Sequence, residues 1–112
     1  MADTIFAPPI APGFEYAVEF EVGGTEVVFP EGVQLRSQIR RSERSDLLGT
    51  LTTEQGLRRI SDRVVEVRIP PEVTAQAVGH LMFDLVRTDS DTEEYLYLKL
   101  RIPVTSTVTR PE

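Results

Sequence analysis

Apolar and polar residues alternate along most of the chain with a period of two, which is typical of β-strands that bury one face. The clearest alternation covers residues 14–22, 33–40, 65–69, 81–86 and 95–102. In the first run the face opposite the apolar residues carries three glutamates, Glu15, Glu19 and Glu21. We therefore predict a strand at each run, although Ser37 occupies an inward position in the second.

Turn residues indicate how these strands connect. Gly23 and Gly24 follow the first run, and alternation resumes over residues 25–29, so a hairpin is expected there. Residues 47–53 have the composition of a short strand. Residues 54–60 have room for one helical turn, and the pattern does not decide between strand and helix at that point.

The remaining segments predict a short helix and the last strand of the fold. Residues 71–78 contain good helix formers, with space for about two turns and Thr74 as a candidate cap. Pro103 cannot donate to a sheet ladder and should mark an edge or a bulge, and Val104 and Val108 should carry a last strand. The pattern predicts an all-β fold, an Ig-like antiparallel β-sandwich of about seven strands with one short helical crossover.

The sandwich is expected to span residues 14–112, after an extended arm at residues 1–13. Prolines stiffen this arm and make it unsuited to a sheet interior. Its apolar residues are unusual for a free tail: Ile5, Phe6 and Ile10. We interpret the arm as a docking segment that contacts either its own domain or a neighbouring subunit.

The composition narrows the possible chemistry and partners. The chain of 112 residues has no cysteine, which excludes a disulfide, a thiolate nucleophile and a Cys-based zinc site. Its net charge of −6 argues against duplex nucleic acid or an anionic membrane as a partner. The pattern of a signal peptide and the roughly 20 apolar residues of a bilayer span are both missing. We therefore expect a soluble protein that is made in a cytoplasm.

Arginine and tyrosine supply the candidate contact residues. Four arginines lie within nine residues, at Arg36, Arg40, Arg41 and Arg44. Arginine without lysine favours bidentate contacts with protein carboxylates, so this group is either a solvated strand end or an ion-pairing patch for a protein partner. Tyr95 and Tyr97 should point outward, and tyrosine is enriched at interfaces. They form either a protein-contact stripe or part of a solvated sheet face.

No group of residues provides catalytic chemistry. His80 is the only histidine and lacks an evident orienting partner. The carboxylates of Asp89, Asp91, Glu93 and Glu94 fit an ordinary turn or a weak cation site. We predict that the protein is not an enzyme and has no cofactor, no metal and no small-molecule substrate.

Several segments, taken in order, resemble a known family. Residues 34–40 (QLRSQIR) resemble the x-x-R-x-Q-I-R strand of small Ig-like virion proteins encoded in the structural gene clusters of tailed bacteriophages. Residues 65–69 and 74–78 match the next strand and crossover of that pattern, residues 81–85 match its Y-x-Y-D-L/V strand, and residues 108–110 match its closing V-T-R. The similarity covers residues 14–110. This chain departs from the pattern at Leu81, which replaces an aromatic residue, at Pro103, and near Leu100, where a glycine is missing.

The resemblance implies a structural protein of the virion, related to the N-terminal Ig-like domain of phage baseplate upper proteins. We expect it to assemble with neighbouring subunits of the tail, baseplate or fibre-attachment region through its arm and a sheet face or edge. Its partners would be other virion subunits and further copies of itself in a symmetric oligomer. The family brings no catalytic residues. Two alternatives remain open: a head decoration protein that clamps the capsid, and a host-surface carbohydrate-binding module that uses Tyr95 and Tyr97.

Overall fold

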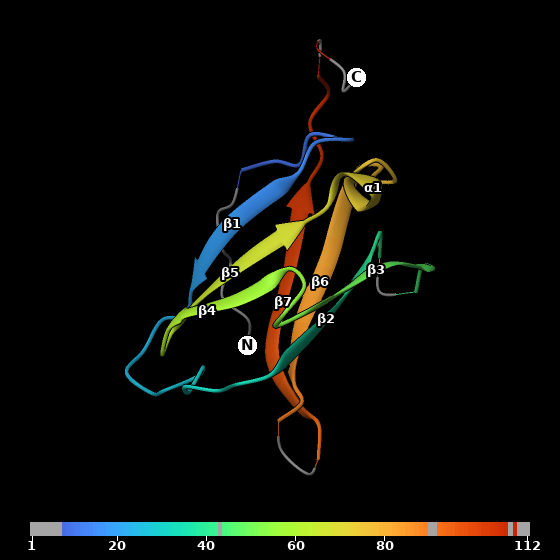
Figure 1. Ribbon diagram of the computed structural model, residues 1–112. Helices are drawn as coiled ribbons and strands as arrows, with labels where there is room; N and C mark the ends of the chain where they lie inside the picture. Colours follow the sequence, from blue (N-terminus) through green and yellow to red (C-terminus); the bar gives the residue numbers. More distant parts are fainter. Residues whose placement is uncertain (1–7, 43, 90–91, 108, 110–112) are drawn as a thin grey trace.

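The chain folds into an all-β sandwich of two antiparallel sheets (Figure 1). The computed structural model describes residues 8–42, 44–89, 92–107 and 109. One sheet has the order β1-β5-β4, with β1 at Tyr16–Glu21, β5 at Val64–Ile69 and β4 at Leu57–Ser61. The other has the order β3-β2-β6-β7, with bounds Leu47–Thr52, Leu35–Arg40, His80–Arg87 and Glu94–Pro103. The short helix α1, Pro71–Thr74, lies between β5 and β6.

This strand order is that of an immunoglobulin-like sandwich. In such folds strands B, E and D share one sheet, and strands C, F and G share the other, to which variable-type domains add C′. Here β1, β5 and β4 take the places of B, E and D, while β3, β2, β6 and β7 take those of C′, C, F and G. The helix α1 therefore occupies the connection from E to F, where the chain crosses between sheets. The predicted fold class and crossover are confirmed.

The core lies between the two sheets and is filled by the inward residues that the alternation predicts. Val65, Val67 and Ile69 of β5 are fully buried. The ring centroids of Phe20 on β1 and Phe83 on β6 lie 5.8 Å apart with a tilted geometry, so aromatic packing joins the two sheets. Ser37 on β2 is also inward and 1% exposed, and its hydroxyl oxygen has no hydrogen-bond partner.

The predicted hairpin at residues 14–29 is wrong. β1 pairs with β5, from Tyr16 opposite Ile69 to Glu21 opposite Val64, and residues 22–29 form no strand. Phe29 is the one fully buried residue of this segment, while Val22 and Val28 are partly buried against the core and Val27 is 57% exposed. β5 offers β1 three inward apolar residues, which is a larger gain than residues 25–29 can supply.

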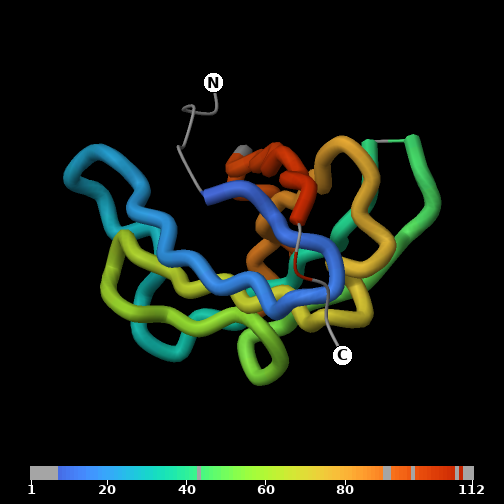
Figure 2. The backbone as a smooth tube through the Cα atoms, turned by 90° about the horizontal axis from the view of Figure 1, so that it is seen from above, coloured from blue at the N-terminus to red at the C-terminus, as the bar shows by residue number. Residues whose placement is uncertain are grey.

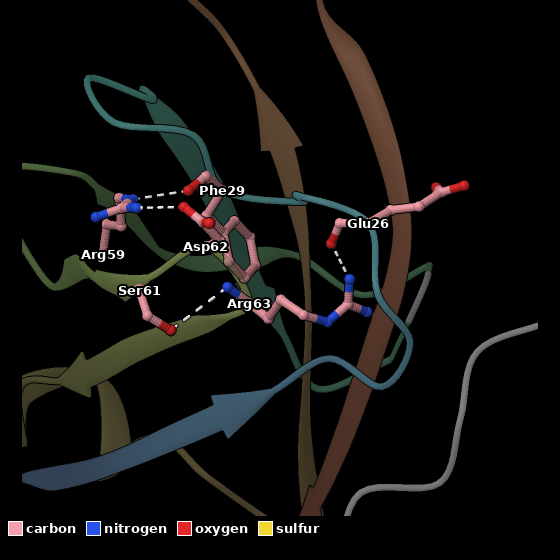
Figure 3. Close-up of polar contacts among 6 residues, drawn as sticks. All are labelled: Glu26, Phe29, Arg59, Ser61, Asp62 and Arg63. Carbon is pink, nitrogen blue, oxygen red and sulfur yellow. Dashed lines mark hydrogen bonds and ion pairs between the residues drawn. The ribbon is translucent and has the colours of Figure 1, made fainter.

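Two arginines hold this loop against the turn between β4 and β5 (Figure 3). The Arg63 guanidinium donates to the backbone oxygens of Val22, Gly23 and Glu26. Arg59 donates from Nε to the Phe29 oxygen at 2.7 Å, and from Nη2 to Oδ1 of Asp62 at 2.6 Å. The loop's carbonyl oxygens are thus bonded by these two side chains, while the amides of Val22, Val28 and Phe29 donate to backbone oxygens of Asp62 and Arg63.

The structure settles one open segment and revises two local predictions. Residues 57–61, where the pattern left strand and helix open, form the strand β4, because Leu57 is buried and pairs with Val67. Thr74 caps no helix N-terminus: it is buried, it donates to the Phe14 oxygen at 2.7 Å, and it accepts from the Gly13 amide at 3.1 Å. The expected last strand is missing from the described residues after Pro103, where Val104 only bridges to Ile10; Val108 lies outside the described residues.

Candidate functional site

The described part of the arm docks on its own domain. Ile10 is fully buried in the core, and its amide donates to the Pro103 oxygen while its oxygen accepts from the Thr105 amide, both at 2.8 Å. Figure 2 shows this blue segment beside the red end of β7. As an interface candidate Ile10 is therefore wrong, because its side chain is already used inside the protein. Ile5 and Phe6 lie outside the described residues.

Tyr16 of β1 binds the first described residue of the arm. Its hydroxyl donates to the Pro8 oxygen at 2.6 Å. Burial raises the pKa of the Tyr16 hydroxyl to about 12, because the phenolate would lose its hydration inside the protein. The neutral donor is thus favoured wherever the arm is docked.

The outer surface of the four-stranded sheet, which we call the basic face, carries three of the candidate contact residues, Arg36, Arg40 and Tyr95. Strand register places Arg40 beside Met82 and Met82 beside Arg101 in one row. A neighbouring row brings Asp84 beside Lys99. The charged side chains of this face are Arg36, Arg40, Asp84, Glu93, Lys99 and Arg101. It therefore carries four cations and two carboxylates.

A groove of about 240 Å³ runs across the basic face. Its lining comes from β2, β6, β7 and the residues just after β2: Gln38, Arg40, Ser42, Met82, Phe83, Asp84, Tyr95 and Lys99. Tyr95 is 37% exposed. Cationic, amide, thioether and phenol groups around one concavity suit a carboxylate with an apolar stem better than a purely apolar ligand.

The four clustered arginines do not form one patch. Arg36 forms a bidentate ion pair with the Glu93 carboxylate, with hydrogen bonds of 2.8 and 3.1 Å. Arg40 donates to the Ser45 oxygen at 2.8 Å and to Oε1 of Gln38 at 2.9 Å. Both belong to the basic face. Arg41 instead donates to the Gln76 oxygen beyond α1 at 3.0 Å, and Arg44 is exposed in the turn before β3.

The structure describes the side chain of Tyr95 but not that of Tyr97. Tyr95 lies opposite Val86 and lines the groove, as its predicted outward direction requires. Tyr97 belongs to β7, but its side chain lies outside the described part of the structure. The sequence did not single out Gln38, Met82 or Asp84, because the adjacency of β2 and β6 leaves no local signal in the chain.

Two arginines bind carboxylates of the acidic turn between β6 and β7. Arg87 donates to both carboxylate oxygens of Asp89, at 2.7 and 3.0 Å, and this hydrogen bonding lowers the pKa of Asp89. Glu93 binds Arg36, and Asp91 lies outside the described residues. Within the described ranges, no three Asp, Glu or His side chains are grouped so that they could hold a metal ion. The nearest polar neighbour of the His80 ring is Arg101 Nη2, 3.4 Å from Nδ1.

The opposite surface, the outer face of β1, β5 and β4, has the other sign, and we call it the acidic face. Its charged side chains are Glu15, Glu19, Glu21, Arg58, Glu66 and Arg68. Arg68 bonds Glu66 at 2.9 Å and Glu15 at 3.3 Å. Four carboxylates against two arginines leave this face negative, as the alternating glutamates of residues 15–21 indicated in part.

Comparison with known proteins gives no further guide to function. No protein-family model, no curated protein and no solved structure matches this chain. No helix in the described residues is long and apolar enough to cross a membrane. The resemblance to phage virion proteins thus stays a prediction.

Proposed function

We propose that this protein is a non-enzymatic structural component of a bacteriophage virion, placed in the tail, baseplate or fibre-attachment region. It binds a neighbouring subunit through the groove of the basic face. The observation that carries this proposal is that Arg40, Tyr95 and Lys99 line one groove on the outer face of the four-stranded sheet. The family resemblance of residues 34–40, which include the whole of β2, supplies the virion setting.

The chemistry of the groove supports a protein carboxylate as its ligand. Arg40 is held by Ser45 and Gln38, so little side-chain entropy is lost when it binds an acidic group. Tyr95 adds a rigid aromatic surface next to the cations. Two carboxylates, Asp84 and Glu93, share the face, which favours a partner of defined charge pattern over a uniformly anionic polymer.

The partial docking of the arm also bears on assembly. Ile10 completes the domain's own core, so its side chain is not available to a neighbouring subunit. The outer face of the four-stranded sheet stays exposed when the domain is folded. The principal contact is therefore proposed at the basic face.

Particles of a phage that encodes this protein test the proposal. Cryo-electron microscopy at side-chain resolution should locate the domain in the tail, baseplate or neck, with Arg40 and Lys99 against a neighbouring subunit. Density over the capsid shell would instead establish a decoration protein. Absence from purified particles, checked by mass spectrometry, would overturn the virion assignment.

A matched pair of variants tests the groove. Arg40→Glu combined with Lys99→Glu should reduce incorporation into particles at least tenfold, on the order expected when two interfacial ion pairs become repulsive. Glu31→Lys changes the charge of an exposed turn away from both faces and should incorporate normally. Equal incorporation of both variants would show that the groove is not the contact.

A further inference from the structure

The acidic face contains a repulsion that the domain does not relieve. Glu19 of β1 lies directly opposite Glu66 of β5, and like charges in that position destabilise a sheet. Glu66 is compensated, because Arg68 bonds it at 2.9 Å and Arg58 lies opposite it on β4. Within the described residues Glu19 and Glu21 have no ion pair, and both are exposed. This pair of carboxylates is thus available to an external cation.

The basic face presents cations with a matching geometry. Lys99 and Arg101 are two residues apart on β7, as Glu19 and Glu21 are on β1. Side chains at this spacing point the same way and lie about 6.6 Å apart along a strand. Arg40 is in the same row as Arg101 across the sheet, through Met82. A strand carrying Glu19 and Glu21 therefore meets cations at its own repeat.

We infer that copies of this chain bind one another head to tail, with the acidic face of one copy on the basic face of the next. The Glu19 and Glu21 carboxylates enter the groove beside Arg40, Lys99 and Arg101 of the neighbouring copy. This inference rests on the proposed function, since it names a second copy of the chain as the occupant of the same groove. It does not require a virion to be tested.

Charge determines which faces of two copies can bind each other. Pairing two basic faces, or two acidic faces, would bring like charges together, which costs free energy. The acidic-to-basic arrangement joins two different surfaces and leaves one of each sign unoccupied at the ends. Such a heterologous contact propagates into a closed ring or an open filament.

Purified protein tests the inference directly by sedimentation velocity and light scattering. The wild type should form oligomers that grow with concentration in about 50 mM salt and weaken in about 0.5 M salt, because screening shortens the range of charge interactions. A wild type that stays monomeric at millimolar concentration in low salt would overturn the inference. In that case Glu19 and Glu21 would only protect the edge strand β1 against aggregation. The protein could then still be a virion component bound to other subunits.

Two half-blocked variants establish the polarity. Glu19→Gln with Glu21→Gln removes the charge of the acidic contact but keeps the basic face, and Lys99→Gln with Arg101→Gln does the reverse. Each variant alone should associate at least tenfold more weakly than the wild type. An equimolar mixture should give a one-to-one dimer that does not grow further. A mixture that stays monomeric, or variants that oligomerise as the wild type does, would contradict the head-to-tail contact.

Two controls separate folding from binding. Circular dichroism melts should show both variants folded, and Arg40→Glu offers a second basic-face variant if the β7 pair does not fold. Glu31→Lys should leave the oligomers unchanged. Loss of oligomers in that control would indicate that net charge alone, and not face-to-face contact, governs association.

Discussion

Arginines at two places in this molecule have different surroundings. At the turn between β4 and β5, Arg59 and Arg63 donate to backbone oxygens of the loop at residues 22–29. On β2, Arg36 and Arg40 stand on the outer face of the sheet, where Arg36 meets only the side chain of Glu93. The first pair replaces a missing strand partner, and the second pair is part of an exposed charged surface.

This difference shows that the contribution of an arginine to stability depends on its hydrogen-bond partner and not on the residue type alone. A backbone carbonyl in a folded loop cannot move to water without local unfolding, so its bond to Arg63 is coupled to the fold. An exposed carboxylate such as Glu93 keeps its hydration when Arg36 is lost. Arg59 and Arg63 should thus contribute more to stability than Arg36 does, whereas Arg40 of β2 also donates to a backbone oxygen, that of Ser45.

The largest effect is expected from Arg63→Ala. It removes the donor to three carbonyl oxygens in the loop, and hydrogen bonds from charged groups stabilise proteins more than neutral ones, so unfolding should become easier by about 2 kcal/mol. Urea denaturation followed by circular dichroism measures this. Arg58→Ala, on the outer face of the adjacent strand, should change stability by less than about 0.5 kcal/mol. Equal losses in the two variants would remove the distinction between the arginine classes.

Gly24→Ala should have the next largest effect. Gly24 has a φ of 109°, and a Cβ there would lie 2.9 Å from Nη2 of Arg63. Backbone strain and displacement of the guanidinium together should cost about 1.5 kcal/mol. Gly32→Ala is a matched control, with a φ of 79° and open space around the added atom. Chemical denaturation should show a smaller loss for Gly32→Ala; a loss as large would assign the whole effect to backbone strain.

Tyr16 is an uncharged donor that, like Arg59 and Arg63, hydrogen-bonds a backbone oxygen. Burial raises its pKa to about 12 in the folded state, above the ordinary value of 10.0. The raised pKa contributes stability that is fully present below pH 10 and is lost as the pH rises toward 12. Thermal melts between pH 8 and pH 11 should show this decline, and Tyr16→Phe should flatten it. A wild-type melting temperature that falls no faster than that of Tyr16→Phe would contradict the role of the phenol.

The smallest change in stability is expected from Arg36→Ala. The Arg36 side chain is 37% exposed and that of Glu93 is 58% exposed, so the ion pair should contribute only about 0.5 kcal/mol. Equilibrium denaturation should barely distinguish this variant from the wild type. A loss as large as that of Arg63→Ala would mean that the β2 arginines also hold the fold.

Much of the fold could be predicted because strand periodicity is local. The inward positions of Leu81, Phe83 and Leu85 follow from a side-chain direction that reverses at every residue, and they are buried as expected. The outward direction of Tyr95 follows in the same way. The candidate site was predicted less well, because Arg41 turns toward Gln76 while Lys99 and Met82 join Arg40 only through strand pairing.

The sequence by itself determined which residues of β1, β2, β5, β6 and β7 face the core, the all-β class and the short crossover after Pro70. Each of these depends on side chains within a few residues of one another. The tertiary structure alone decided that β1 pairs with β5 instead of residues 25–29, that Ile10 completes the core, and that the two outer faces carry opposite charge. Those outcomes depend on which distant strands become neighbours, and that is fixed by the total area buried between two sheets.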